Sequence, residues 1–98
     1  MFSKHKRIKD RKTIQAVRKK YCEACGNRTT IEPHHMYSVG SGGGDIRENL
    51  IQLCSVCHIA AHSGAIDRES LKKIVAEREG IDADKLHRIN RQAMGYEV

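Results

Sequence analysis

The sequence of 98 residues contains no tryptophan, one phenylalanine and one proline, and it has no apolar run long enough to cross a membrane. With so few large aromatic side chains, a chain of this length buries only a modest apolar core. We therefore expect one small domain that needs an additional stabilising cross-link, such as a bound metal or a disulfide. No apolar stretch follows the charged N-terminus, which argues against a secretory signal peptide. We therefore expect a cytoplasmic protein.

Acidic residues are nearly absent from the first 20 residues, where Asp10 stands against nine basic residues. We expect residues 1–11 to be a basic mobile segment and residues 12–98 to form a single domain. Such a segment favours a polyanion partner, most simply nucleic acid, although a solvated tail that only aids solubility would have the same composition. The candidate nucleic-acid contacts are Lys4, Lys6, Arg7, Lys9, Arg11, Lys12, Arg18, Lys19 and Lys20.

The four cysteines form two C-x-x-C pairs, Cys22 with Cys25 and Cys54 with Cys57. In a reducing compartment this spacing favours zinc over disulfides. Four thiolates complete the tetrahedral coordination of zinc, so such a site stabilises the fold and leaves no open position for activating water. We expect a structural Zn²⁺ at these cysteines.

Histidines gather around the second cysteine pair. His58 and His62 are four residues apart, which places both rings on one face of a helix, and His34 and His35 are adjacent in the chain. If the zinc site holds these two stretches side by side, the histidines form a second site built from nitrogen. We expect one metal to fold the chain and another to take part in chemistry.

Local patterns predict short elements before the second cysteine pair. Apolar spacing predicts a basic helix over about 12–20, and β-prone residues predict strands at 29–31 and 35–39, separated by Pro33. The glycine-rich stretch 40–44 lacks the Lys-Ser/Thr of a P-loop, so we interpret it as the flexible connection of a hairpin.

Helices are predicted after the second cysteine pair. One runs over 55–62 and begins with Ser55 as its N-cap. Two more occupy 67–93 and begin at Asp67 and Asp82, with apolar residues on one side of each. We expect these two helices to be packing elements whose charged residues form a solvated face.

Taken together, the motifs resemble the HNH endonucleases, which belong to the His-Me finger (ββα-metal) nucleases, in the subset with a four-cysteine zinc. The resemblance covers about residues 21–62 and rests on Cys22-x-x-Cys25, Pro33-His34-His35, the glycine-rich loop with Asp45, Asn49-Leu50 and Leu53-Cys54-x-x-Cys57-His58. It implies a small α+β fold, in which a ββα-metal core is stapled by the four-cysteine zinc and flanked by α-helices.

The resemblance also implies a role for each site residue. His35 would be the general base, and Asn49 would tie the loop to this base and orient its ring. The catalytic divalent metal would be held by His34, His58 and His62. Because three histidines bring no negative charge, the set favours Mn²⁺, Ni²⁺, Co²⁺ or Zn²⁺ over Mg²⁺.

These roles describe a metal-dependent DNA endonuclease that hydrolyses phosphodiester bonds by nicking or by cutting both strands. Histidine suits the base because its ordinary pKa is about 6.5. Double-stranded DNA is the expected partner, and a homodimer or a partner protein would supply targeting. The alternative is a non-catalytic zinc-stabilised nucleic-acid-binding module. A zinc deaminase is excluded, because the H-x-E motif of that class is missing.

Overall fold

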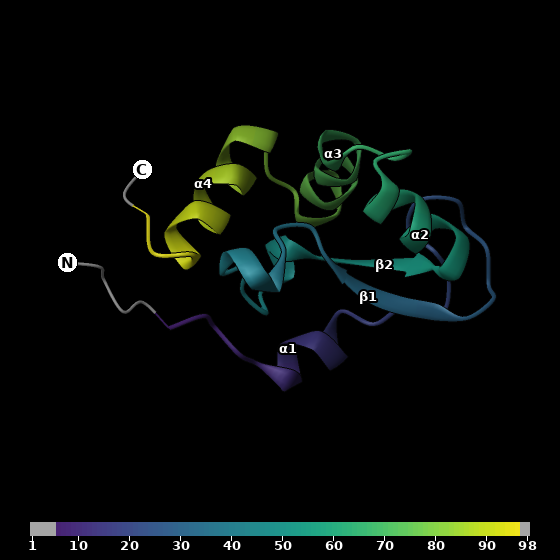
Figure 1. Cartoon of the computed structure of the whole chain (residues 1–98), viewed down its shortest axis with the longest axis horizontal. Coiled ribbons are helices and arrows are strands. Elements are labelled where there is room, and N and C mark those ends of the chain that lie inside the picture. The colour runs from purple at the N-terminus through teal and green to yellow at the C-terminus, as the bar shows by residue number, and fades with distance from the viewer. Residues whose placement is uncertain (1–5, 97–98) are drawn as a thin grey trace.

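The computed structural model describes residues 6–96 and places helices on both sides of a two-stranded sheet (Figure 1). The elements are α1 (Arg11–Ala16), β1 (Ile31–His35), two short 3-10 helices (Val39–Ser41 and Arg47–Asn49), β2 (Leu50–Cys54), α2 (Ser55–Ser63), α3 (Arg68–Glu79) and α4 (Ala83–Ala93). Helix α1 lies on one side of the sheet, and α2, α3 and α4 lie on the other. This is the small α+β architecture expected from the sequence. None of the helices within residues 6–96 is long and apolar enough to cross a membrane.

The two strands are antiparallel, and their register pairs Ile31 with Cys54 and His35 with Leu50. The predicted strand pattern is wrong here, because β1 runs through Pro33 and residues 36–39 form no strand. A two-stranded sheet leaves one edge of each strand unpaired, so a proline is accommodated without loss of a ladder hydrogen bond. The strand therefore carries both histidines of the His34-His35 pair.

Residues 40–44, expected as a flexible hairpin connection, instead include the end of a 3-10 helix. The Ser38 side chain accepts a hydrogen bond from the Ser41 N–H at the start of this helix, and Gly42 ends it with φ 94°. At Gly43 a Cβ atom would lie only 1.7 Å from the Tyr37 carbonyl oxygen. Glycine is needed at that position so that the loop can pass close to the end of β1.

Helix α2 begins at Ser55, but its N-cap is Cys54 and not Ser55. The Cys54 Sγ accepts a hydrogen bond from the Cys57 N–H at 3.5 Å, while Ser55 is exposed. Because the cysteine at the end of β2 caps the next helix, the second cysteine pair is part of the turn from strand to helix.

The other helix starts follow the sequence prediction more closely. Asp67 caps α3 and Asp82 caps α4, each accepting a backbone hydrogen bond from the residue three positions on. Helix α1 is shorter than predicted and ends at Ala16, close to the buried Val17. The basic residues at 18–20 then leave the helical path, because they add charge and no apolar contact to stabilise another turn.

The core joins β2 to the two C-terminal helices. Its largest fully buried apolar side chains are Leu50, Ile51, Leu53, Leu71, Val75 and Leu86. The expectation of solvated charges fails for Arg78, which contacts Glu23 at 3.0 Å and the Leu50 carbonyl oxygen at 3.0 Å. Since the Glu23 side chain also accepts the Gln52 N–H at 2.7 Å, this ion pair connects α3, β2 and the first cysteine turn.

Candidate metal centres and active site

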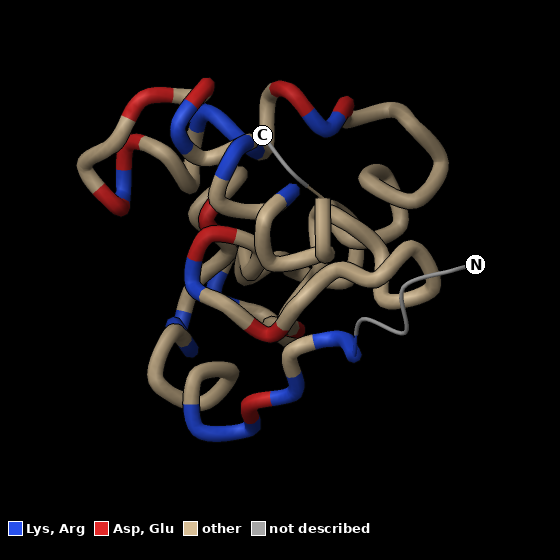
Figure 2. The backbone as a smooth tube through the Cα atoms, turned by 90° about the vertical axis from the view of Figure 1, so that its left-hand side faces the viewer, with Lys and Arg blue, Asp and Glu red and all other residues tan. Residues whose placement is uncertain are grey.

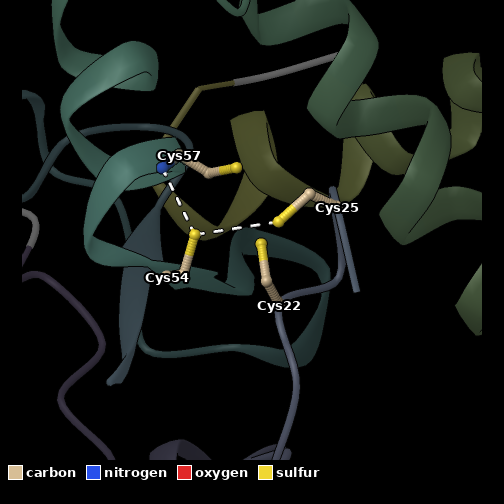
Figure 3. A group of neighbouring side chains, drawn as sticks. All are labelled: Cys22, Cys25, Cys54 and Cys57. Atoms are coloured by element: carbon tan, nitrogen blue, oxygen red, sulfur yellow. Dashed lines mark hydrogen bonds between the residues drawn. The ribbon is translucent and has the colours of Figure 1, made fainter. Parts of the chain in front are cut away.

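Four cysteine side chains converge where β2 meets α2, pointing toward one another (Figure 3). Cys22 and Cys25 come from a turn after α1, and Cys54 and Cys57 flank the start of α2. The sulfur atoms all lie within 4.8 Å of one another, and the Sγ atoms of Cys25 and Cys54 are 3.8 Å apart. Zinc bonds of about 2.3 Å separate two tetrahedral sulfur ligands by about 3.8 Å. The cluster therefore fits a structural zinc ion, as the sequence predicted.

The backbone around the cysteines also suits a metal. The Gly26 N–H donates to the Cys22 carbonyl oxygen at 2.8 Å and closes the turn, with Gly26 at φ 80°. Burial raises the pKa of the Cys57 thiol, and contacts with the neighbouring thiols raise it further. Four crowded sulfurs resist becoming thiolates together, and a divalent cation among them would remove that conflict.

Three histidines form a separate cluster, in which β1 contributes His34 and α2 contributes His58 and His62. The His34 ring centroid lies 5.1 Å from each of the other two, and the Nε2 atoms of His58 and His62 are 3.1 Å apart. Nitrogen ligands about 2.0–2.1 Å from a metal lie about 3.0–3.4 Å from each other when they are adjacent in the coordination sphere. The structure thus brings together the three predicted ligands at a spacing that fits one divalent ion.

Glu32, which sequence reasoning missed, orients one of these ligands. Its Oε1 lies 3.2 Å from the His58 Nδ1 atom. A carboxylate at Nδ1 favours the proton on that nitrogen and leaves the Nε2 lone pair toward His62. The signal available in the sequence was the alternation of β1, which puts Glu32 on the same face as His34, two residues later.

His34 is the buried member of the cluster, with 9% of its surface exposed. Burial is the largest cause that lowers the pKa of His34 to about 4, and the nearby rings of His58, His62 and His35 act in the same direction. The imidazole is therefore neutral near pH 7, which is the state in which histidine binds metals.

His35 faces a different partner. Its Nε2 atom lies 2.8 Å from Oδ1 of Asp45, which is 5% exposed. Burial raises the pKa of the Asp45 carboxyl, but hydrogen bonds from Arg7 and His35 outweigh burial and lower the pKa to about 2. An ionised carboxylate at Nε2 holds the proton there and leaves Nδ1 as the basic ring atom.

Asn49 is fully buried and ties the loop to the end of β1. Its Nδ2 donates to the carbonyl oxygens of Tyr37 and Gly44, both at 3.0 Å, and its Oδ1 accepts the Tyr37 N–H. The side chain thus holds the loop next to Asp45. Among the described contacts, the one made to the His35 ring comes from Asp45 and not from Asn49.

The basic N-terminal residues follow one edge of the molecule in Figure 2. Lys4 lies outside the described residues. Lys6, Lys9, Arg11, Lys12, Arg18 and Lys20 are exposed, and Lys19 lies 5.8 Å from the centre of the Tyr21 ring. Arg7 differs from the others, because its guanidinium is bonded to Asp45 at 2.7 Å with only 19% of the side chain exposed.

Two open cavities share the histidines. All four site histidines line a cavity of about 240 Å³, and His34, His35 and His62 also line a neighbouring cavity of about 360 Å³. Arg68, at the start of α3, lines the larger one and lies 4.8 Å from the centre of the Tyr37 ring. The cluster of three histidines and His35 are therefore accessible to the same ligand.

The family model of the HNH endonucleases matches residues 22–64, which include every cysteine and all four site histidines. Searches among curated proteins and among solved structures gave no significant match. The matched stretch contains β1, β2 and α2 in the order strand, strand, helix, which is the arrangement of the ββα-metal fold. Residues 22–64 of this chain therefore match the HNH endonuclease family and contain the four-cysteine site.

Proposed function

We propose that this domain is a metal-dependent endonuclease that hydrolyses phosphodiester bonds of DNA, with His35 as the general base. The observation that carries the proposal is the shared cavity lined by His34, His35, His58 and His62. Phosphodiester hydrolysis needs a base for the attacking water and a positive centre beside the phosphate. Here the base, His35, and the three histidines of the metal site line the same cavity.

Asp45 sets which ring nitrogen of His35 carries the proton. Because the His35 Nε2 atom is hydrogen-bonded to Asp45, Nδ1 is the ring atom that takes the proton from water. The carboxylate then stabilises the imidazolium that forms. As the oxygen of water bonds to phosphorus, the bond from phosphorus to O3′ breaks. The products are a 5′-phosphate and, once the leaving oxygen gains a proton, a 3′-hydroxyl.

His34, His58 and His62 would hold the divalent metal of this reaction, with Glu32 orienting the ring of His58. When bound, such an ion supplies Lewis-acid stabilisation of the charge on the phosphate and the leaving oxygen. Neutral nitrogen donors favour Mn²⁺, Ni²⁺, Co²⁺ or Zn²⁺ over Mg²⁺.

The distribution of cations supports DNA as the substrate. Arg68 lines the larger cavity together with His34 and His35, so its guanidinium is positioned to contact a phosphate next to the scissile one. The exposed lysines and arginines of residues 6–20 provide further contacts to the backbone of DNA.

Plasmid cleavage tests the proposal directly. Purified protein is incubated with supercoiled plasmid and with Mn²⁺, Ni²⁺, Co²⁺, Zn²⁺ or Mg²⁺ separately, beside an EDTA control and the His35→Ala variant. We expect nicked or linear plasmid only with metal, and a loss of at least about 100-fold in rate for His35→Ala, because a general base contributes about 10²–10⁴-fold.

Two controls make the result specific. The His35→Ala variant must keep its thermal transition and its affinity for DNA, which separates loss of the base from loss of the fold. Equal cleavage by both proteins would refute the role of His35. Binding of DNA without cleavage under every metal would instead favour the non-catalytic zinc-stabilised binding module.

A further inference from the structure

The N-terminal segment meets the active-site loop at the Asp45 carboxylate. Arg7 Nη1 donates to Oδ1 at 2.7 Å, the Asp10 N–H donates to Oδ2 at 2.9 Å, and His35 Nε2 lies 2.8 Å from Oδ1. Both carboxylate oxygens are therefore engaged. Two of the three partners come from a segment that is more than 30 residues away in the chain and precedes the matched HNH stretch.

Arg7 is itself fixed in place by the loop it contacts. Its Nη1 also donates to the Gly43 carbonyl oxygen at 3.0 Å, and Nη2 lies 3.5 Å from Asp45 Oδ2. The backbone of the segment is attached as well, because the Asp45 N–H donates to the Ile8 carbonyl oxygen at 2.8 Å. Side chain and main chain together hold the segment against residues 43–45.

We propose that Arg7 is a positioning residue of the active site, which holds the Asp45 carboxylate in the orientation that directs His35 Nδ1 toward the cavity. Without Arg7, the carboxylate would keep His35 and the Asp10 N–H as partners, and this N–H belongs to the segment that Arg7 itself helps to hold against the loop. A guanidinium that reaches both of its oxygens fixes the plane of the carboxylate. The inference rests on the proposed function, since it gives His35 the role of base.

This role separates Arg7 from the other basic residues of the segment. Lys6 and Lys9 are exposed and, within residues 6–96, make no hydrogen bond or ion pair, so they are free to meet phosphate. Arg7 has its charge matched by a buried carboxylate. Loss of Arg7 should therefore slow turnover, whereas loss of Lys9 should weaken DNA binding and reduce its salt dependence.

Kinetics of full-length variants test the proposal. We expect Arg7→Ala to lower kcat on the order of 10- to 100-fold, as loss of a supporting hydrogen-bond partner does, with KM within about twofold of the parent value. Arg88→Ala, which removes an exposed arginine from α4, is the matched control and should keep kcat. Arg7→Lys keeps the charge without the planar fork and should recover part of the loss.

A double-variant cycle tests whether Arg7 acts through Asp45. If it does, Arg7→Ala combined with Asp45→Asn should be no slower than Asp45→Asn alone, because the two residues act as one unit. Multiplied losses in the double variant would overturn the proposal. Should Arg7→Ala fail to fold, Arg7→Gln replaces it in the same cycle.

A readout without catalysis keeps this inference distinct from the nuclease proposal. Nitrogen NMR of the His35 ring at pH 8, with zinc at the cysteines and no other metal, should show the proton on Nε2 alone in the parent and in Lys9→Ala. We expect a mixture of both ring tautomers in Arg7→Ala.

An unchanged His35 tautomer in Arg7→Ala, with a salt slope of DNA binding reduced by about one, would make Arg7 a phosphate contact and overturn the inference. If the parent protein does not cleave DNA but the tautomer responds to Arg7, the nuclease proposal fails and the positioning role stands.

Discussion

Oε1 of Glu32 lies 3.2 Å from Nδ1 of His58, so a carboxylate on β1 sets the orientation of a ring on α2. The two residues are 26 positions apart in the chain and meet because β1 packs beside the helix. The contact leaves His58 Nε2 free to face His62, at 3.1 Å from the Nε2 atom of that ring.

This contact predicts that Glu32→Ala weakens metal binding at the histidines about 10- to 100-fold, because outer partners of metal-bound histidines contribute that much. Titration calorimetry with Mn²⁺ or Co²⁺ on zinc-loaded protein measures the effect. Glu77→Ala removes an exposed carboxylate from α3 and serves as the control for net charge. Equal affinities of the two variants would mean that Glu32 is a surface residue without a role.

Cys54 and Cys25, from the two pairs of the four-cysteine site, should differ in their importance for folding. Cys54 is 1% exposed and caps α2, whereas Cys25 is exposed. We expect Cys54→Ser to abolish the cooperative thermal transition followed by circular dichroism, since zinc binding and folding are coupled. Cys25→Ser should keep a transition at lower temperature. The prediction is wrong if Cys54→Ser melts as the parent does, or if chelation of zinc leaves the transition unchanged.

Asp45 should make the stability of the protein depend on pH in the acid range. Burial raises its carboxyl pKa, but the hydrogen bonds from Arg7 and His35 lower the pKa to about 2 from the ordinary value of 3.8. A carboxyl with a lowered pKa stabilises the fold above its ordinary pKa, and this stabilisation is lost as the pH falls from about 4 to about 2.

Asp45→Asn should therefore reduce the free energy of unfolding on the order of 1–2 kcal/mol at pH 7, and the difference from the parent should narrow as the pH falls below about 4. Urea unfolding across this range measures the gap between the two proteins. The comparison uses the pH values at which both proteins still unfold cooperatively, because protonation of the cysteines would release zinc and unfold the domain. Asp84→Asn, on the exposed side of α4, is the control, and a constant gap at all pH values would contradict the assignment.

A side chain at Gly43 should clash with the backbone, and Gly40 provides the control. A Cβ atom there would lie 1.7 Å from the Tyr37 carbonyl oxygen and 2.9 Å from Asn49 Nδ2, whereas at Gly40 it would meet nothing within 4 Å. We expect Gly43→Ala to lower the free energy of unfolding by about 2 kcal/mol or more, because the overlap is with backbone. Gly40→Ala should change it by less than about 0.5 kcal/mol. Similar denaturation midpoints would show that the loop can move away from Tyr37.

The sequence was sufficient wherever the decisive contact is local. Spacing alone paired the cysteines and put His58 and His62 on one face of α2, and Asp67 and Asp82 were recognisable as helix caps. These features depend on positions three or four residues apart, which helix geometry converts directly into distance. The HNH resemblance added which histidines belong to one cluster.

The errors arose where packing overrides local preference. Pro33 predicts a break between strands, but β1 runs through it because the sheet has only two strands and accepts a proline. The charged residues of the two C-terminal helices were predicted to form a solvated face, but the guanidinium of Arg78 is bound by Glu23 and the Leu50 carbonyl oxygen. Both outcomes depend on distant parts of the chain, because Pro33 needs an unpaired strand edge and Arg78 needs the Glu23 carboxylate.

By itself, then, the sequence determined which side chains offer metal-type ligands and the basic character of the N-terminal segment, while the ββα core followed only from the resemblance to the HNH endonucleases. Only the tertiary structure decided which carboxylate is hydrogen-bonded to which histidine. Glu32 contacts His58, and Asp45, itself bound by Arg7, contacts His35. The physical reason is that a hydrogen bond between side chains 10 to 38 residues apart depends on where the intervening loops return. No local sequence pattern encodes the positions of these loops, because the packing of the whole domain fixes them.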